Sequence, residues 1–377
     1  MMKNVKNTIS KNKGFKVIMI ILIVILILIL AAFLFIKLNP VFGGSPDKND
    51  KADYKTRADN YIDGKFTYPD KYSIDGLLED IRISQKGTKP AETLPYTTPD
   101  FAENPASDEV YVTWLGHSAL FIQMHGMNIL IDPLFSDRAS PVSFAGPERF
   151  SEPFIKPEEL PDIDIILLSH DHYDHLDMKT IKALDSKTDC FIVPLGVENH
   201  LERWNVKSDK IRNMAWWEEI DINGLTIACA PARHYSGRYV IDSGNTLFAS
   251  WILKDEYHQI FESGDSGFGG HFEDIHNRYG DFDFVMIDCA QYDMRWHASH
   301  MFPEESVNAC ATLGAKFTMP VHWGAYSLST HAWDDPPVRF SKYAEELEID
   351  VVTPMLGETM NIDTPEEYKE KWWENIK

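Results

Sequence analysis

The sequence predicts an α/β domain with layered sheets, preceded by a transmembrane helix. Two observations carry this prediction. Strand-like and helix-like segments alternate over about 250 residues in the second part of the chain, which is typical of a single α/β domain. Before them, residues 17–36 lack any polar side chain, and a helix of this length spans about 30 Å, the thickness of a hydrocarbon core.

Charge and hydropathy divide the N-terminal region. Residues 1–16 carry lysines and no acidic residue, so we expect a basic cytoplasmic N-terminus. Residues 17–36 are the predicted signal anchor, because cleaved signal peptides have shorter apolar regions of about 7–15 residues. A cleaved signal and a buried soluble helix are the alternatives. The anchor predicts a single-pass protein of the cell membrane, with the remaining chain outside the cytoplasm.

The segment after the anchor, residues 37–108, is rich in Asp, Lys, Pro, Thr and Tyr. We expect it to be a stalk and a packing arm, with an amphipathic piece at 73–84. Residues 109–377 are expected to form the folded domain.

The composition excludes two classes of protein. With 44% hydrophobic residues the chain can fill a core, so it is not a disordered acidic chain. The net charge of −22 opposes binding to phosphate backbones, and no nucleic-acid partner is expected. The four cysteines have no C-x-x-C spacing and are expected to be small buried residues; they are Cys190, Cys229, Cys289 and Cys310.

Short β-rich segments bounded by Gly, His or Pro predict the strands. The residues between the second and third strands, 125–127, suit a hairpin turn. Strands are predicted at 110–115, 119–124, 128–133, 163–169, 191–194, 225–230, 246–253, 258–264 and 282–289. Helices are predicted at 178–184, 303–313, 339–348 and 365–375, the last from a capping-box spacing of Thr364 and Glu367 around a first-turn proline.

A histidine-rich loop follows the strand at 163–169. It reads H-D-H-Y-D-H from His170 to His175 and holds three of the 14 histidines of the chain. His170 and His172 can point to one side of an extended segment, whereas Asp174 and His175 follow a chain turn. Imidazoles with a carboxylate are ligands that zinc and other first-row divalent metals accept, so the loop predicts a metal site. A histidine-rich surface loop is the alternative.

Later strand ends offer the further ligands that one loop cannot supply. His234 in PARHYSGR, Asp265 in ESGDSGF and His322 in MPVHWGAY each follow a short apolar strand and have small neighbours. In α/β domains such strand ends carry the chemistry. We therefore expect these three side chains to join the first loop.

Several motifs together resemble a known family. The run H-x-H-x-D-H followed by His, Asp and His is similar to the metallo-β-lactamase fold hydrolases, which are αββα sandwiches. The motifs TWLGHSA, IDPLFSDRASP, GPERF, SHDHYDHLD, WWEE, FESGDSGF and PVHWGAY resemble, within that fold, N-acylphosphatidylethanolamine-hydrolysing phospholipase D and its bacterial relatives. The resemblance covers residues 111–357 and implies that 109–377 is a catalytic domain.

The resemblance implies a pair of zinc ions, and Fe or Mn also suits these ligands. His170, His172 and His234 would hold the first ion. Asp174, His175 and His322 would hold the second, and Asp265 would bridge the two. A hydroxide shared by the metals would be the nucleophile, since binding lowers the pKa of water from 15.7 toward about 7. The implied substrate is a phospholipid or other phosphodiester, cleaved to a phosphatidic acid and an N-acylethanolamine.

Other polar residues are expected near the metals. Asp132 and His117 are predicted to orient metal ligands. His300 and His331 are candidate proton donors or partners of the ligands. The segment 292–300 is shorter than in the animal enzymes, which leaves the substrate contacts of His297 and His300 open.

Two other functions fit the same residues. A lactone or carboxylic-ester hydrolase would use the same pair of metals, and a non-catalytic surface module would hold them structurally. A structural zinc site is usually closed by four ligands, which argues against the module. A homodimer is left open. The pairs Trp216-Trp217 and Trp372-Trp373 are expected to pack in cores or on helix faces, with a membrane-proximal role as the alternative for the second pair.

Overall fold

The computed structural model describes residues 2–69, 87–103, 105–239 and 241–376. By its internal contacts the chain divides into two compact units, Met1–Phe42 and Gly43–Lys377. The first unit contains helix α1 (Met2–Leu38) and a 3-10 turn, Pro40–Phe42. Within α1, the most apolar 18-residue stretch of Phe15–Leu38 has a mean hydropathy of 3.7, and none of that stretch is buried. By length and composition this helix is a candidate membrane span, as the sequence predicted.

The second unit begins with a small N-terminal arm, made of α2 (Lys48–Arg57), β1 (Tyr61–Ile62) and β2 (Lys65–Phe66). Asp47 caps α2, because its carboxylate accepts hydrogen bonds from the backbone N–H groups of Asn49 and Asp50. The described part of the predicted stalk and packing arm beyond Phe42 therefore belongs to the same compact unit as the sheets. The amphipathic piece predicted at 73–84 lies outside the described residues.

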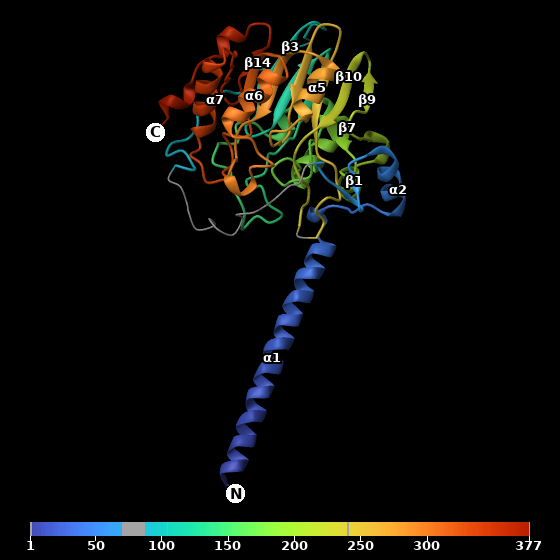
Figure 1. Ribbon diagram of the computed structural model, residues 1–377, viewed down its shortest axis with the longest axis vertical. Coiled ribbons are helices and arrows are strands. Elements are labelled where there is room, and N and C mark those ends of the chain that lie inside the picture. The colour runs from blue at the N-terminus through green and yellow to red at the C-terminus, as the bar shows by residue number, and fades with distance from the viewer. Residues whose placement is uncertain (1, 70–86, 104, 240, 377) are drawn as a thin grey trace. The chain divides into compact units, whose positions relative to one another are not determined.

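Two sheets make up most of the described part of the second unit (Figure 1). The first sheet has the order β15 (Thr359–Asn361), β3 (Val110–Trp114), β4 (Leu120–Met124), β5 (Met127–Ile131), β6 (Ile163–Leu167), β7 (Thr188–Pro194) and β8 (Ile211–Met214). The second has the order β14 (Ala315–Val321), β13 (Phe282–Asp288), β12 (Gln259–Glu262), β11 (Ala249–Lys254), β10 (Leu225–Pro231) and β9 (Glu219–Ile222). In the first sheet, the strands from β15 to β5 in this order pair antiparallel and those from β5 to β8 pair parallel; in the second, β12, β13 and β14 are parallel and the other pairs are antiparallel. Each predicted strand is present.

The predicted hairpin joins β4 and β5. Met124 pairs with Met127, so His125 and Gly126 form a two-residue turn. Both have a positive φ, 54° and 70°, which is the conformation that a tight hairpin turn requires.

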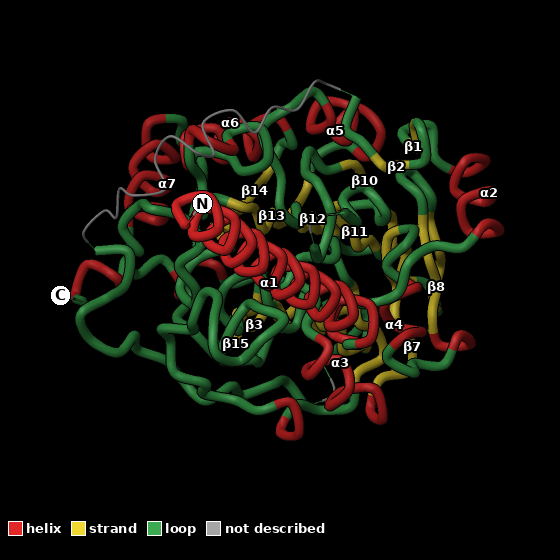
Figure 2. Tube along the Cα trace, turned by 90° about the horizontal axis from the view of Figure 1, so that it is seen from below, coloured by secondary structure: helices red, strands yellow, loops and turns green. Residues whose placement is uncertain are grey.

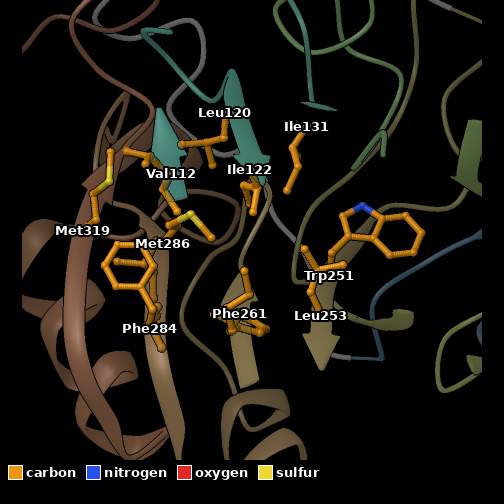
Figure 3. Packing of buried hydrophobic residues seen from close by; sticks show 14 of the residues in the cluster. Val112, Leu120, Ile122, Ile131, Trp251, Leu253, Phe261, Phe284, Met286 and Met319 are labelled. Atoms are coloured by element: carbon orange, nitrogen blue, oxygen red, sulfur yellow. The ribbon is translucent and has the colours of Figure 1, made fainter. Parts of the chain in front are cut away.

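Alternating side chains of the strands fill two separate cores. Val112, Ile122 and Ile131 of the first sheet face Trp251 and Phe261 of the second, and all are buried in one cluster (Figure 3). The residues between them point the other way, where Phe121, Leu130 and Ile166 pack with Ile181 and Leu201 of two helices. Burying each such side chain contributes roughly 1.5–3 kcal/mol, so both faces of the first sheet hold the fold together.

Helices cover the outer faces of both sheets (Figure 2). The helices α3 (Met178–Leu184) and α4 (Glu198–Arg203) lie on the first sheet. The helices α5 (His271–Tyr279), α6 (Pro303–Thr312) and α7 (Asp335–Glu346) lie on the second. The predicted αββα order is confirmed.

The helix predicted at 365–375 is wrong. The chain forms two 3-10 turns there, Pro365–Tyr368 and Trp372–Asn375, and Thr364 makes no side-chain cap. Trp372 and Trp373 are both buried, and both rings pack against Trp323 at 5.2 and 5.6 Å. The prediction that this pair packs in a core is confirmed.

Candidate metal centre

Loops at the ends of four strands meet at one edge of the sandwich. His170 to His175 follow β6, His234 follows β10, Asp265 follows β12 and His322 follows β14. The sequence predicted that these side chains converge, and the structure brings all of them together.

Three imidazoles form one group. The Nδ1 atom of His172 lies 2.9 Å from Nε2 of His170 and 3.1 Å from Nε2 of His234. The Oδ2 atom of Asp265 lies 3.7 Å from the Nε2 atoms of both His170 and His234. These four residues offer ligand atoms that lie within 4.8 Å of one another, close enough to hold one metal ion.

A second group lies on the other side of Asp265. Its Oδ1 atom is 3.1 Å from Nε2 of His175 and 3.3 Å from Nε2 of His322. Asp174 Oδ2 is 3.4 Å from the same atom of His175 and 3.3 Å from that of His322. One carboxylate therefore faces two separate sets of imidazoles.

The polar atoms of this cluster suit a metal. His175 Nε2 and Asp265 Oδ1 are buried, and neither has a hydrogen-bond partner among the described residues. Buried polar atoms without a partner cost free energy unless something else binds them. A divalent cation between the imidazoles and carboxylates would bind both atoms.

The pKa shifts of the site residues also favour a bound cation. Burial would raise the pKa of Asp265, but His175 and His322 hold it well below its usual value, so the carboxylate is ionised. Burial lowers the pKa of His170 well below its usual value and keeps this ring neutral, as a metal ligand requires. Burial would also lower the pKa of His322, yet Asp265 and Asp288 raise it to about 10. The carboxylates therefore favour a positive charge at this point.

Comparisons with known proteins decide the family. The Beta-lactamase superfamily domain matches residues 127–323, more than half of the chain. The chain belongs to this superfamily. An uncharacterized protein of Mycobacterium tuberculosis is 35% identical over 326 residues, which cover 83% of this chain and 87% of that protein.

Two further proteins are similar to this chain in sequence or in fold. N-acyl-phosphatidylethanolamine-hydrolyzing phospholipase D 1 of Caenorhabditis elegans is 34% identical over 233 residues, 59% of this chain and 65% of that enzyme. The solved structure of Igni18, a metallo hydrolase from Ignicoccus hospitalis, has a TM-score of 0.52 at 19% identity, covering 67% of this chain and 98% of that one. The chain is a metal-dependent hydrolase of the metallo-β-lactamase fold.

In this superfamily hydrolase the carboxylate of Asp132 holds the ring of His175 from the side opposite to Asp265. Asp132 accepts a hydrogen bond of 2.7 Å from Nδ1 of His175 and another of 2.7 Å from the backbone N–H of Ser169. Asp132 has a positive φ of 42°. It thus lies where an orienting residue was expected, and it turns Nε2 of His175 toward Asp265.

Asp288 plays the same part for two other rings, and the sequence analysis missed it. Its carboxylate accepts hydrogen bonds from Nδ1 of His322 at 3.1 Å and from Nδ1 of His300 at 3.0 Å. Asp288 ends the apolar strand β13, just as Asp132 follows β5. A lone acid at the end of a buried strand was the signal that could have found it.

His117 lies closer to the site than expected. Its Nε2 is 3.0 Å from Oδ2 of Asp174, and burial lowers its pKa to about 3, so the ring is neutral. Its backbone pairs with Trp323 and His322, linking the two sheets at the site. His117 belongs to a group with Asp174, His175 and His322 whose atoms could hold a metal.

The other candidate histidines differ in position. His300 has its Nε2 3.9 Å from Asp265 Oδ2 and lines the cavity at the site. His331 accepts a hydrogen bond from the backbone N–H of Gln291 and donates one to the carbonyl of Ala332, so both ring nitrogens are used by the backbone. His297 is exposed and pairs with Glu305 at 2.9 Å.

A cavity of about 350 Å³ opens onto this centre, and we call it the metal cavity. Both candidate metal ligands and apolar side chains line it. It is lined by Ala139, Pro147, His172, Tyr173, Asp174, Tyr235, Asp265, Gln291, Trp296, His300, His322 and Leu328.

Proposed function

We propose that this hydrolase holds a pair of divalent metals and cleaves the phosphodiester of an N-acylphosphatidylethanolamine or a related phospholipid in the manner of a phospholipase D. The observation that carries the proposal is the place of Asp265. Its two oxygens face two sets of imidazoles, at 3.7 Å on one side and 3.1 to 3.3 Å on the other. A bridging carboxylate is what a pair of metals needs.

The proposed ligands are those expected from the sequence. His170, His172 and His234 would hold one ion, and Asp174, His175 and His322 the other. Zinc fits these nitrogen and oxygen donors, as do Fe and Mn. When bound, such ions supply an activated water and stabilise negative charge on the reacting group.

The residues of the chain bind and orient. Asp174 and Asp265 would neutralise part of the metal charge and leave a net positive spot, which attracts one anionic phosphodiester although the whole chain carries −22. His300 is held by Asp288 at the cavity wall and is our candidate for handing a proton to the leaving alcohol. His117 and Asp132 would orient Asp174 and His175.

The relative in Caenorhabditis elegans supports the lipid substrate, since its name states that activity and it is 34% identical over the matched region. The candidate span in α1 supports an anchored enzyme. We propose that residues 1–16 lie in the cytoplasm, that 17–36 cross the cell membrane, that 37–108 form a stalk and packing arm, and that the catalytic domain, 109–377, lies outside. Protease added to intact cells should then remove the domain. Protection in intact cells with cleavage after lysis would contradict this topology.

The substrate is tested with three compounds and one pair of variants. The full chain, purified in detergent, is assayed against N-acylphosphatidylethanolamine, bis(p-nitrophenyl) phosphate and a lactone, and its metal content is measured. We expect both phosphodiesters to be cleaved and the lactone to be spared. His172→Ala should abolish turnover and metal binding. His297→Ala, the same change at an exposed ring, should do neither. Cleavage of the lactone alone, or fewer than one metal per chain, would contradict the proposal.

A further inference from the structure

The most exposed apolar side chains of the second unit lie on loops that also contribute residues to the wall of the metal cavity. Among its described residues, the three large hydrophobic side chains with the highest exposure are Phe144, Ile241 and Met294, at 84%, 78% and 73%. Exposed apolar groups of this kind mark an interaction site when they share one region.

The chain connects each of these side chains to the cavity wall. Phe144 lies between Ala139 and Pro147, and Met294 lies between Gln291 and Trp296, all four of which line the metal cavity. Ile241 lies on the loop that follows Tyr235, another lining residue. Figure 1 draws these three loops, in green, yellow and orange, at the same lower edge of the sheets. We call the described residues 139–147, 235–239, 241–245 and 291–296 the apolar rim.

The rim is free of exposed charge. Loop 139–147 has no charged residue. In the others, Asp293 pairs with the buried Arg295, and Asp242 is buried and accepts hydrogen bonds from the backbone of the loop. Among the described residues of the rim, the exposed side chains are therefore apolar, aromatic or small. Such a surface can enter hydrocarbon without burying an unpaired charge.

The size of the cavity shows what part of a lipid it can take. Its 350 Å³ is at the small end of ligand pockets, which range from about 300 to 1,000 Å³. This room suits a phosphodiester headgroup and not the acyl chains attached to it. While the headgroup is at the metals, the chains must lie outside the mouth, against the rim.

We propose that the apolar rim inserts into the lipid bilayer, so that the mouth of the metal cavity opens onto the membrane and the acyl chains of the substrate stay in hydrocarbon. The proposal rests on the proposed function and deepens it by naming how the lipid reaches the site. Phe144, Ile241 and Met294 would enter the acyl region, with Tyr235 and Trp296 at the level of the headgroups, where aromatic rings are favoured.

Insertion is tested with a fluorescent probe, without reference to turnover. The full chain, carrying Cys190→Ser to remove a half-buried thiol, is labelled with an environment-sensitive dye at Phe144→Cys, Met294→Cys or Val338→Cys. It is reconstituted into phosphatidylcholine vesicles that contain lipids with a nitroxide on the acyl chain. We expect the dye at positions 144 and 294 to be quenched several-fold more than at 338, an exposed apolar position on α7.

Two results would overturn the proposal. One is equal quenching at all three positions. The other is a dye at position 144 that is already shielded in detergent while the chain runs as a dimer, because the rim would then contact a second copy.

A second measurement links the rim to catalysis. Phe144→Asp and Met294→Asp should each lower the ratio of turnover on vesicle lipid to turnover on bis(p-nitrophenyl) phosphate by about tenfold, from the loss of one buried side chain. Val338→Asp should leave the ratio unchanged. Strong quenching at the rim without any lipid turnover would leave insertion in place and refute the proposed substrate, so the two proposals fail separately.

Discussion

Two cavities of nearly equal volume differ in whether the polar side chains around them have hydrogen-bond partners. The metal cavity has about 350 Å³. A second cavity of about 360 Å³ lies between the N-terminal arm and the second sheet, and Arg57, Tyr68, Trp216 and His271 are among its lining residues. We call it the arm cavity. Volume alone would rank the arm cavity slightly higher.

The polar groups of the arm cavity are used by the fold. Tyr68 Oη lies 3.0 Å from Nδ1 of His271, whose Nε2 lies 3.1 Å from Oγ of Ser266. Arg57 donates to the carboxylate of Glu218 at 2.6 and 3.0 Å. At the metal centre, by contrast, His175 Nε2 and Asp265 Oδ1 have no hydrogen-bond partner in the part of the chain that the structure describes. Convergent polar atoms without hydrogen-bond partners, rather than cavity volume, distinguish the candidate metal centre from the arm cavity.

The largest predicted effect contrasts one carboxylate from each cavity. Asp265→Asn should remove metal binding at both sets and lower phosphodiesterase activity by more than the about 10–100-fold that loss of an outer partner costs. Asp274→Asn, in the arm cavity, should change neither quantity. Metal analysis and initial rates on bis(p-nitrophenyl) phosphate check both variants. Normal metal content in the first variant would remove the distinction between the cavities.

The next prediction concerns Asp288, whose carboxylate accepts hydrogen bonds from the rings of His322 and His300. Asp288→Asn should weaken metal binding by about 10–100-fold, because one of the two rings, His322 or His300, loses its acceptor oxygen and the other keeps only an uncharged one. Asp283→Asn is the matched control. Asp283 lies on the same strand, and among the described residues its carboxylate accepts a hydrogen bond only from the backbone of Gln259. Competition with a chelator measures the affinities, and equal values for the two variants would refute the orienting role.

An effect of similar size, but confined to one set of ligands, is expected at His117. Its contact of 3.0 Å with Asp174 is a hydrogen bond to a charged group, worth about 1.5–3 kcal/mol. His117→Ala should therefore lower metal affinity by roughly ten- to hundredfold at the set that contains Asp174. Absorption spectra of the Co²⁺ form, titrated metal by metal, would detect this. Loss of affinity at the His170 set instead would contradict the assignment.

The smallest effect belongs to the arm cavity. Tyr68→Phe removes one hydrogen-bonding hydroxyl and should destabilise the fold by about 1 kcal/mol. The melting temperature should fall by about 2–4 °C, and metal affinity should not change. A clear loss of metal would show that His271 and Ser266 transmit strain from the arm to Asp265.

The clustering of the candidate ligands could be predicted from the sequence because metal chemistry restricts such ligands to a few residue types at strand ends. His170, His234, Asp265 and His322 all stand where an apolar strand stops. The two-sheet order followed from strand patterns and from the family motifs. The residue types at strand ends and the strand patterns are local features of the sequence, so they can be read without knowledge of the packing.

Other features depend on contacts between distant segments. Asp288 looks like the last residue of a strand until His300 and His322 fold onto it. Trp372 and Trp373 looked like part of an α-helix, but the chain forms a 3-10 turn there and both rings pack on Trp323. Arg57 binds Glu218, which lies 161 residues away along the chain, and no spacing in the sequence indicates that pair.

The central claim is that the site directs water to phosphorus. Hydrolysis of N-acylphosphatidylethanolamine by the full chain in water enriched in oxygen-18 tests this directly, with mass spectrometry of the products. The account predicts one labelled oxygen in the phosphate of the phosphatidic acid and none in the N-acylethanolamine. Label in a released fatty acid would mean attack at a carbonyl, and label in the alcohol of the N-acylethanolamine would mean attack at carbon; either result would contradict the account.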